Sequence, residues 1–170
     1  MQKKADKKIG VFLGRLQPQH PGHETMIRQI FKENDEVVFC VGSAQEITPD
    51  NANFDRNPLL IHNRLKTLHS FLKSEGFQKP YTIVTAQDIE PDSAWPAYLK
   101  TKCCLSDMNR NTIYFGDIIP KDYEEGLMKV GFKIKIIDRK KFTYKTPQDT
   151  LHKISSSTEI RGLEKRAKYL

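Results

Sequence analysis

Long apolar runs are absent from this chain of 170 residues, where runs such as Ile9–Leu13 and Val37–Val41 end after five positions. A helix needs about 20 apolar residues to cross a bilayer, so we expect no membrane span. The basic start, MQKKADKK, leads only into the first of these runs. We therefore also expect no secretory signal.

Cysteine is scarce as well. The three cysteines include the adjacent pair Cys103 and Cys104, which provides neither a disulfide framework nor the spacing of a metal site. We therefore predict a reduced, cytoplasmic location and no metal site built from these cysteines.

Internal repeats, low-complexity tracts and linker-like segments are also missing. Hydrophobic residues make up 38% of the chain and charged residues 29%, which is typical of a globular protein. The length suits one domain with a proper core. We predict a single domain over residues 1–170, with residues 1–8 as a flexible basic terminus.

Negative charge is in the minority, because 28 Lys and Arg stand against 21 Asp and Glu, a formal charge of +7. This excess suits an anionic partner, either a nucleic acid or a phosphorylated small molecule. Two common phosphate motifs are absent: the chain has neither G-x-x-x-x-G-K-[ST] nor a G-x-G-x-x-G after a strand. A K-M-S-K-S-like loop is absent too, which disfavours a class I aminoacyl-tRNA synthetase fragment.

Apolar, β-branched runs recur along the chain and alternate with segments of helical spacing. This alternation predicts an α/β fold, a Rossmann-like parallel sheet of about five strands with helices on both faces. The predicted strands are Ile9–Leu13, Val37–Val41, Tyr81–Thr85, Thr112–Phe115 and Phe132–Ile137.

The first predicted helix presents the apolar residues Met26, Ile27, Ile30 and Phe31, and the second presents Ile61, Leu65, Leu68 and Leu72. For the second helix we expect Asn57 as N-cap, Pro58 at the first position and an end near Gly76. Further helices are predicted over Ala94–Lys102, Tyr123–Val130 and Thr158–Tyr169.

Ligands of such sheets bind beyond the carboxyl ends of the strands, so the informative loops are 14–22, 42–57, 86–95, 116–120 and 138–157. The first contains His20-Pro21-Gly22-His23 at the start of a helix. Free backbone N–H groups and the helix dipole attract an anion there, and two imidazoles three residues apart can face it together. The pair could instead bind a metal, or cap the helix at the surface.

A second polar cluster, ISSSTEIRG, covers Ile154 to Gly162. Ser156 and Glu159 have the spacing of a capping box, which alone explains a helix start. The additional hydroxyls and Arg161, one turn into the helix, favour a second polyanion site. Two such helix starts can hold a chain of phosphates from both sides.

These motifs together resemble those of the nucleotidyltransferase superfamily, as H-x-G-H and S-S-T-x-[IV]-R. The resemblance is closest to nicotinamide-mononucleotide (NMN) adenylyltransferases of the archaeal type, because further blocks follow in the family's order and cover most of the chain. These blocks are GRLQPQHPGH, VGSAQE, DRNP, QDIEPDSAW and IYFGD.

The resemblance implies that ATP and NMN are joined into NAD and pyrophosphate. It assigns His20, His23 and Arg161 to catalysis. It places ATP against Gly14, Arg15, Phe115, Gly116, Asp117, Ser156, Ser157 and Thr158.

For NMN the resemblance implies contacts with three residues. Arg56 neutralises phosphate charge, Asp88 makes a polar contact and Trp95 stacks on the nicotinamide ring. Each has a plainer alternative, because Arg56 could form a surface ion pair, Asp88 could be an N-cap and Trp95 could be a core aromatic.

The resemblance also implies Mg²⁺ held mainly by substrate phosphates, and assembly into a homo-oligomer. Two residues depart from the family pattern: Gln19 replaces an aromatic residue, and Ser155 stands where an isoleucine or tyrosine is common. Both bear on the shape of the ATP pocket, and neither removes a charged group.

Three alternatives remain open on the residues. The acceptor could be phosphopantetheine, or nicotinate mononucleotide, since nothing in the sequence distinguishes an amide from a carboxylate. From another class, a basic nucleic-acid-binding domain would use Arg139–Lys145, RKKFTYK. We favour the enzyme, and do not expect nucleic acid or a membrane as partner.

Overall fold

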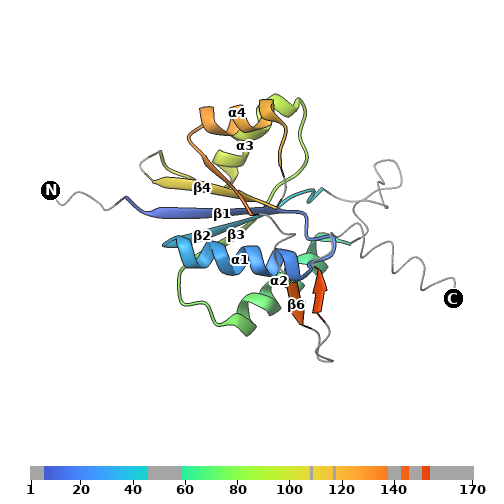
Figure 1. Ribbon diagram of the computed structural model, residues 1–170. Coiled ribbons are helices and arrows are strands. Elements are labelled where there is room, and N and C mark those ends of the chain that lie inside the picture. The colour runs from blue at the N-terminus through green and yellow to red at the C-terminus, as the bar shows by residue number, and fades with distance from the viewer. Residues whose placement is uncertain are drawn as a thin grey trace.

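A parallel sheet of five strands runs through the middle of the structure, a computed structural model (Figure 1). The structure describes residues 6–45, 59–107, 109–116, 118–137, 143–145 and 151–153. The strands are β1 (Lys8–Gly14), β2 (Glu36–Val41), β3 (Tyr81–Thr85), β4 (Arg110–Phe115) and β5 (Lys133–Ile136). Their order is β3-β2-β1-β4-β5, and all four pairings are parallel. The predicted α/β fold is confirmed.

The central strands are apolar because helices cover both faces of the sheet. Neighbouring residues of one strand therefore enter different cores. Phe12 and Phe39 pack in the core on one face, whereas Val11 and Val38 pack in the core on the other. This two-sided burial explains why the strands appear in the sequence as continuous apolar runs.

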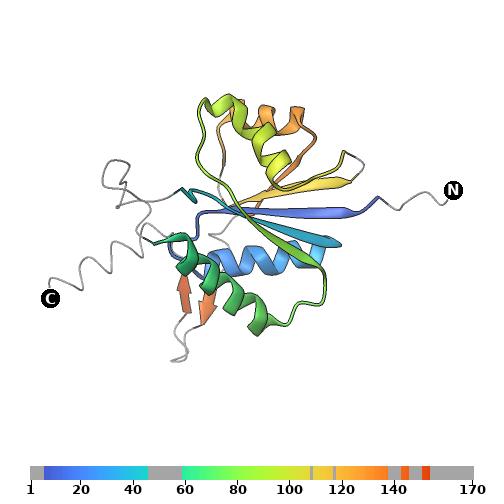
Figure 2. The same ribbon diagram turned by 180° about the vertical axis from the view of Figure 1, so that it is seen from behind.

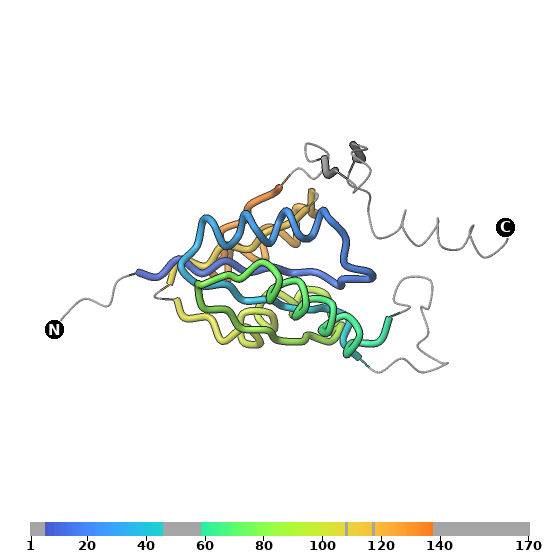
Figure 3. Tube along the Cα trace, turned by 90° about the horizontal axis from the view of Figure 1, so that it is seen from below, coloured from blue at the N-terminus to red at the C-terminus, as the bar shows by residue number. Residues whose placement is uncertain are grey.

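Helices α1 (Pro21–Glu33) and α2 (Ile61–Glu75) cover one face, while α3 (Trp95–Lys102) and α4 (Lys121–Lys129) cover the other (Figures 1 and 2). A short 3-10 turn, Asp92–Ala94, leads into α3. Seen from below, α1 and α2 run side by side along the sheet (Figure 3). The bidentate contact of Arg28 with Glu75, at 2.7 and 2.8 Å, joins these two helices.

Gly10 allows α1 to approach β1 closely. A Cβ atom at this position would lie 2.4 Å from Ile30 Cγ2 and 2.5 Å from Asn34 Nδ2. Asn34 donates from the same nitrogen to Ile30 O at 2.8 Å and to the Tyr114 hydroxyl at 2.9 Å. The end of α1 is thus fixed to both β1 and β4.

The predicted start of α2 is wrong. The helix begins at Ile61 with Leu60 as its N-cap, and not at Asn57 and Pro58, which lie outside the described residues. Leu59 is engaged elsewhere, because its N–H donates to Gln17 Oε1 at 2.8 Å and its carbonyl accepts from Gln17 Nε2 at 3.0 Å. The predicted end at Gly76 is confirmed, with φ of 63°.

Residues 6–8 and parts of segment 138–157 also differ from expectation. Lys8 belongs to β1, Lys7 pairs with Glu36 at 3.3 Å, and Asp6 pairs with Arg110 at 3.3 Å, so residues 6–8 are not a frayed terminus. Segment 138–157, expected as a loop, contains an antiparallel hairpin of β6 (Thr143–Lys145) and β7 (Leu151–Lys153). Its strands have three residues each, too short for a periodic signal. The helix predicted over Thr158–Tyr169 lies outside the described residues.

Candidate active site

The strand order reverses between β1 and β4, because β2 and β3 extend the sheet on one side and β5 on the other. In open α/β sheets the ligand crevice lies beyond the carboxyl ends of the strands at such a point. Gly14 is the last residue of β1 here and Arg15 follows it. In the same way, Phe115 is the last residue of β4 and Gly116 follows it. A Cβ on Gly14 would lie 2.8 Å from the Phe12 ring, so a larger residue here would require the buried Phe12 side chain to shift.

His20 is the N-cap of α1. Its Nδ1 accepts from the N–H of Gly22 at 3.1 Å, and its carbonyl accepts from His23 N at 2.8 Å and Glu24 N at 3.2 Å. The expectation of free amides at this helix start is therefore wrong, because His20 itself engages them. Since Nδ1 is an acceptor, the neutral ring carries its proton on Nε2, a donor nitrogen.

The two imidazoles lie together, with ring centroids 3.8 Å apart and planes inclined by 34°. Both are buried, at 2% exposure for His20 and 8% for His23, and the edge of Phe12 meets His23 at 5.9 Å. The simple alternative of surface capping residues therefore fits only in part: His20 caps the helix, but neither ring is at the surface. Among the described residues, no group of three His, Cys, Asp or Glu side chains could hold a metal ion.

The loop between β1 and α1 is fixed from two directions. The Gln17 amide holds it to Leu59, as described above. Arg64, on α2, donates from Nη1 to the carbonyl of Arg15 at 2.8 Å. Gln19, one of the two departures from the family pattern, donates to Glu24 Oε1 at 3.3 Å and so contacts the first turn of α1.

Arg64 also reaches the loop after β2. Its Nη1 donates to Gly42 O and its Nη2 to Ser43 O, both at 2.8 Å. Sequence reasoning missed this residue. Its position in the sequence could have revealed it, because Ile61, Leu65 and Leu68 of the predicted apolar face surround it at helical spacing. A charged residue on such a face is expected to be buried.

Asp88 lies in the loop after β3 and contacts the loop after β2. Its two carboxylate oxygens accept from Ser43 Oγ at 3.0 Å and from Gln45 Nε2 at 2.7 Å, and its N–H donates to Gln45 Oε1 at 3.2 Å. It is not an N-cap, because the next helical turn begins at Asp92 after Pro91. Ser43 and Gln45 belong to the VGSAQE block, although the sequence did not single them out.

Trp95 is half-buried and is the first residue of α3. This position agrees with the helix predicted over Ala94–Lys102 and not with the loop predicted over 86–95. Its ring centroid lies 6.3 Å from that of Tyr98 and 6.1 Å from that of Tyr123. The ring centroids of Tyr123 and Phe115 are 6.4 Å apart. Burial raises the pKa of the Tyr123 hydroxyl. These rings form a continuous aromatic chain from the end of β4 to α3, and Tyr98 and Tyr123 are the members that sequence reasoning missed.

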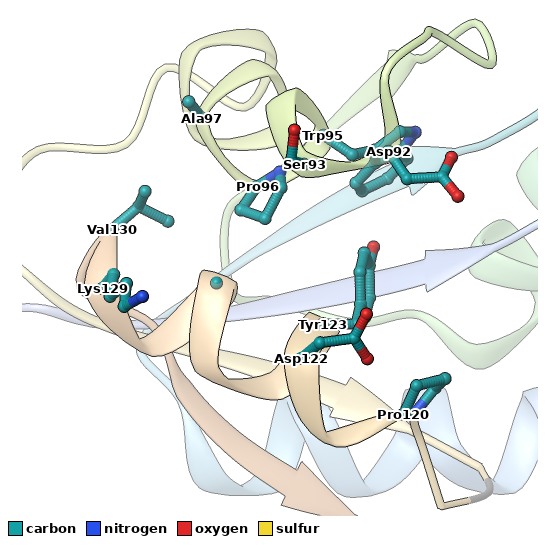
Figure 4. Close-up of a pocket in the computed structure, with 11 residues that line it drawn as sticks. Asp92, Ser93, Trp95, Pro96, Ala97, Pro120, Asp122, Tyr123, Lys129 and Val130 are labelled. Atoms are coloured by element: carbon teal, nitrogen blue, oxygen red, sulfur yellow. The ribbon is translucent and has the colours of Figure 1, made fainter.

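A cavity of about 670 Å³ opens between α3 and α4 beside this chain. Trp95, Pro96 and Tyr123 are among the apolar residues that line it, and Asp92 and Asp122 are among the polar ones (Figure 4). The predicted stacking residue therefore packs partly against the core and also lines an open cavity, so the core-aromatic alternative fits in part.

Several predicted residues lie outside the described part of the chain. These are Arg56, Asp117, Ser156, Ser157, Thr158 and Arg161, together with the departure Ser155. Their convergence on the histidine pair stays a prediction. Within the described residues, no helix is both long and apolar enough to cross a membrane.

The parallel sheet, its reversal point and the histidine-capped helix are the features of a nucleotidyltransferase fold. Residues 11–163 match the family model described as Cytidylyltransferase-like, so the chain belongs to this family.

The names of curated relatives are more specific than the family description. The chain is 33% identical over 92 residues to the nicotinamide-nucleotide adenylyltransferase of Pyrococcus horikoshii, which covers 54% of this chain and 47% of that protein. With the enzyme of the same name from Methanococcus aeolicus it shares 30% identity over 125 residues, covering 74% and 64% of the two chains. The chain thus spans about half the length of the first relatives it matches.

Among solved structures, the fold is similar to that of a bifunctional NMN adenylyltransferase/ADP ribose pyrophosphatase from Francisella tularensis. The TM-score is 0.71 at 20% identity, covering 95% of this chain and 43% of that one. At this identity the likeness establishes the fold.

Proposed function

We propose that this chain transfers the adenylyl group of ATP to nicotinamide mononucleotide, forming NAD and pyrophosphate. The observation that carries the proposal is the buried pair of His20 and His23 at the start of α1, beside the point where the strand order reverses. The relatives named above carry this activity in their names, and the H-x-G-H pair lies within the matched family region.

In the proposed reaction an oxygen of the NMN 5′-phosphate attacks the α-phosphorus of ATP in line. A new oxygen–phosphorus bond forms, the bond from the α-phosphorus to the bridging oxygen breaks, and pyrophosphate leaves with the electron pair. The attacking phosphate is already anionic at neutral pH, so no general base is required. Catalysis then depends on positioning and charge stabilisation.

Residues on both sides of the substrates are proposed to supply both. The Nε2–H of His20 and the His23 ring are proposed to contact the ATP phosphates, together with Arg15. Trp95 is proposed to stack on the nicotinamide ring, and Asp88 to make a polar contact with NMN. Arg56, Arg161 and the hydroxyls of Ser156, Ser157 and Thr158 complete the proposed phosphate contacts.

The ligands available to a divalent cation are the protein side chains and the substrate phosphates. Because the described residues hold no cluster of three ligands, we propose that Mg²⁺ is bound mainly by substrate phosphates and water, where it would screen their charge.

The direct test is a substrate panel. The protein is incubated with ATP, Mg²⁺ and one acceptor at a time: NMN, nicotinate mononucleotide or phosphopantetheine. We expect pyrophosphate release with NMN, with NAD as the second product. Release with phosphopantetheine alone would transfer the chain to another branch of the superfamily. The cytoplasmic location and the homo-oligomer stay predictions, the second measurable by sedimentation.

A further inference from the structure

Arg64 is the largest charged side chain in the described core, with an exposure of 2%. It projects from α2, between the loop after β1 and the loop after β2. All its hydrogen bonds within the described residues go to main-chain carbonyls, those of Arg15, Gly42 and Ser43, each at 2.8 Å. Among the described residues this buried cation has no hydrogen bond to a carboxylate, and because burying a charge is costly, its position needs a physical explanation.

The geometry of these contacts supplies the reason. Arginine carries a rigid, planar group of donors, whereas lysine is a point charge. Here the two terminal nitrogens join the ends of β1 and β2, which are already linked by Gly42 N donating to Gly14 O at 3.1 Å. The guanidinium therefore fixes the directions in which two neighbouring loops leave the sheet.

The first of these loops carries a proposed substrate contact, and the second is hydrogen-bonded to a residue that carries another. Arg15 is the proposed ATP contact, and Arg64 holds its carbonyl. On the other side, Arg64 holds the carbonyl of Ser43, and the Ser43 hydroxyl donates to Asp88, the proposed NMN contact, at 3.0 Å. A continuous set of hydrogen bonds thus connects the two substrate positions through one side chain.

Electrostatic interactions connect the same residues. Burial lowers the pKa of the Arg64 guanidinium, the Asp88 carboxylate raises it and the Arg15 guanidinium lowers it. Arg64 therefore lies within electrostatic reach of both residues.

We propose that Arg64 is a positioning residue, which sets Arg15, in the loop after β1, and Asp88, through Ser43 in the loop after β2, at the separation that in-line attack requires. This inference rests on the proposed function. It predicts that a change at Arg64 impairs the use of both substrates, although its side chain is buried, because a displacement of about 1 Å can reduce a rate by about 100-fold.

The test compares Arg64→Lys with Leu65→Ala, the matched control. Leu65 is the next residue of α2 and packs partly against the core, and its apolar side chain makes none of the three hydrogen bonds. Wild-type protein is assayed first with ATP and NMN; if it makes no NAD, the proposed function fails, whatever the variants do. Melting curves fix a temperature at which every variant is folded.

At that temperature we expect Arg64→Lys to lower kcat/KM for ATP and for NMN by at least tenfold. Leu65→Ala should lower the melting temperature and leave both values within twofold of wild type. A folded Arg64→Lys protein with wild-type kinetics would overturn the proposal, as would a loss of equal size in the control.

Ser43→Ala provides the second test, and it decides the matter if Arg64→Lys does not fold. It leaves the three carbonyl contacts in place and removes only the bond from Ser43 to Asp88. We expect KM for NMN to rise several-fold with KM for ATP unchanged. Unchanged constants for both substrates would show that the connection to Asp88 has no role, and the proposal would fall.

Discussion

At the residue scale, the histidine pair has two separate tasks. His20 caps the start of α1 through its Nδ1 and its carbonyl, so its substitution affects folding as well as chemistry. His23 is a residue of the helix itself and has no capping role. His23 is therefore the better place to test catalysis.

We expect His23→Ala to lower kcat by about 100-fold, the size seen when one preorganised donor to a transition state is removed. KM for NMN should change far less, because the imidazole is proposed to act on the triphosphate as charge moves to the leaving group. Steady-state kinetics measure both constants.

His62→Ala is the matched control, since His62 is exposed on α2, and it should behave as wild type. An effect of His23→Ala confined to KM would contradict a transition-state role.

Trp95 is predicted to act on the other substrate. Trp95→Ala should raise KM for NMN about tenfold or more, because stacking of a base on an aromatic ring contributes about 1–3 kcal/mol. Binding of ATP, measured by calorimetry, should change little. Trp95→Phe keeps a ring and should recover part of the NMN affinity; equal losses for ATP and NMN would refute the assignment.

At the element scale, sequence patterns predicted the sheet well. Continuous apolar runs marked all five strands to within two residues, because strands buried on both faces contain few polar positions. Prediction failed where tertiary contacts decide. The start of α2 is displaced because Gln17 engages Leu59, and no local pattern shows that contact.

The candidate site divides in the same way. The histidine motif and Trp95 stand out by residue type, whereas Gln17, Ser43 and Arg64 act through main-chain groups or through distant partners. Such contacts require the sheet topology, which brings the ends of β1, β2 and β3 together. Arg64 alone had a local signal, as a charge on an apolar helix face.

The contact between α1 and β1 supplies a stability prediction. Gly10→Ala should reduce the free energy of unfolding by about 1–3 kcal/mol, the usual range for overpacking, because its Cβ would lie 2.4 Å from Ile30 Cγ2. Urea titration measures the change. Gly42→Ala is the control, since its Cβ would meet Arg15 Cγ at 4.0 Å, and it should be near neutral.

At the scale of the whole molecule, Tyr114 links the sheet to α1. Its hydroxyl donates to Glu33 Oε2 at 2.7 Å and accepts from Asn34 Nδ2 at 2.9 Å. Burial, together with the Glu33 carboxylate, raises the pKa of Tyr114 to about 12. Burial would raise the pKa of Glu33, but hydrogen bonds from Lys135, Tyr114 and Gln29 outweigh it and lower the value.

This arrangement predicts a loss of stability at alkaline pH. The folded state holds the Tyr114 proton more tightly than the unfolded state, whose pKa is near 10. The contribution is therefore complete below pH 10 and is lost as the pH rises towards about 12. Urea titrations at pH 8 and pH 11 should show a smaller decrease for Tyr114→Phe than for wild type. Equal decreases would contradict the assignment.

The proposed function unites these scales, since the sheet places the loops, the loops place the side chains and the side chains align two phosphates. Phosphorus NMR of the protein with equimolar ATP and NMN tests it most directly. We predict that the resonances of NAD and pyrophosphate grow together in a 1:1 ratio, and only when both substrates are present. Appearance of ADP with inorganic phosphate, or of AMP without NAD, would contradict adenylyl transfer to NMN.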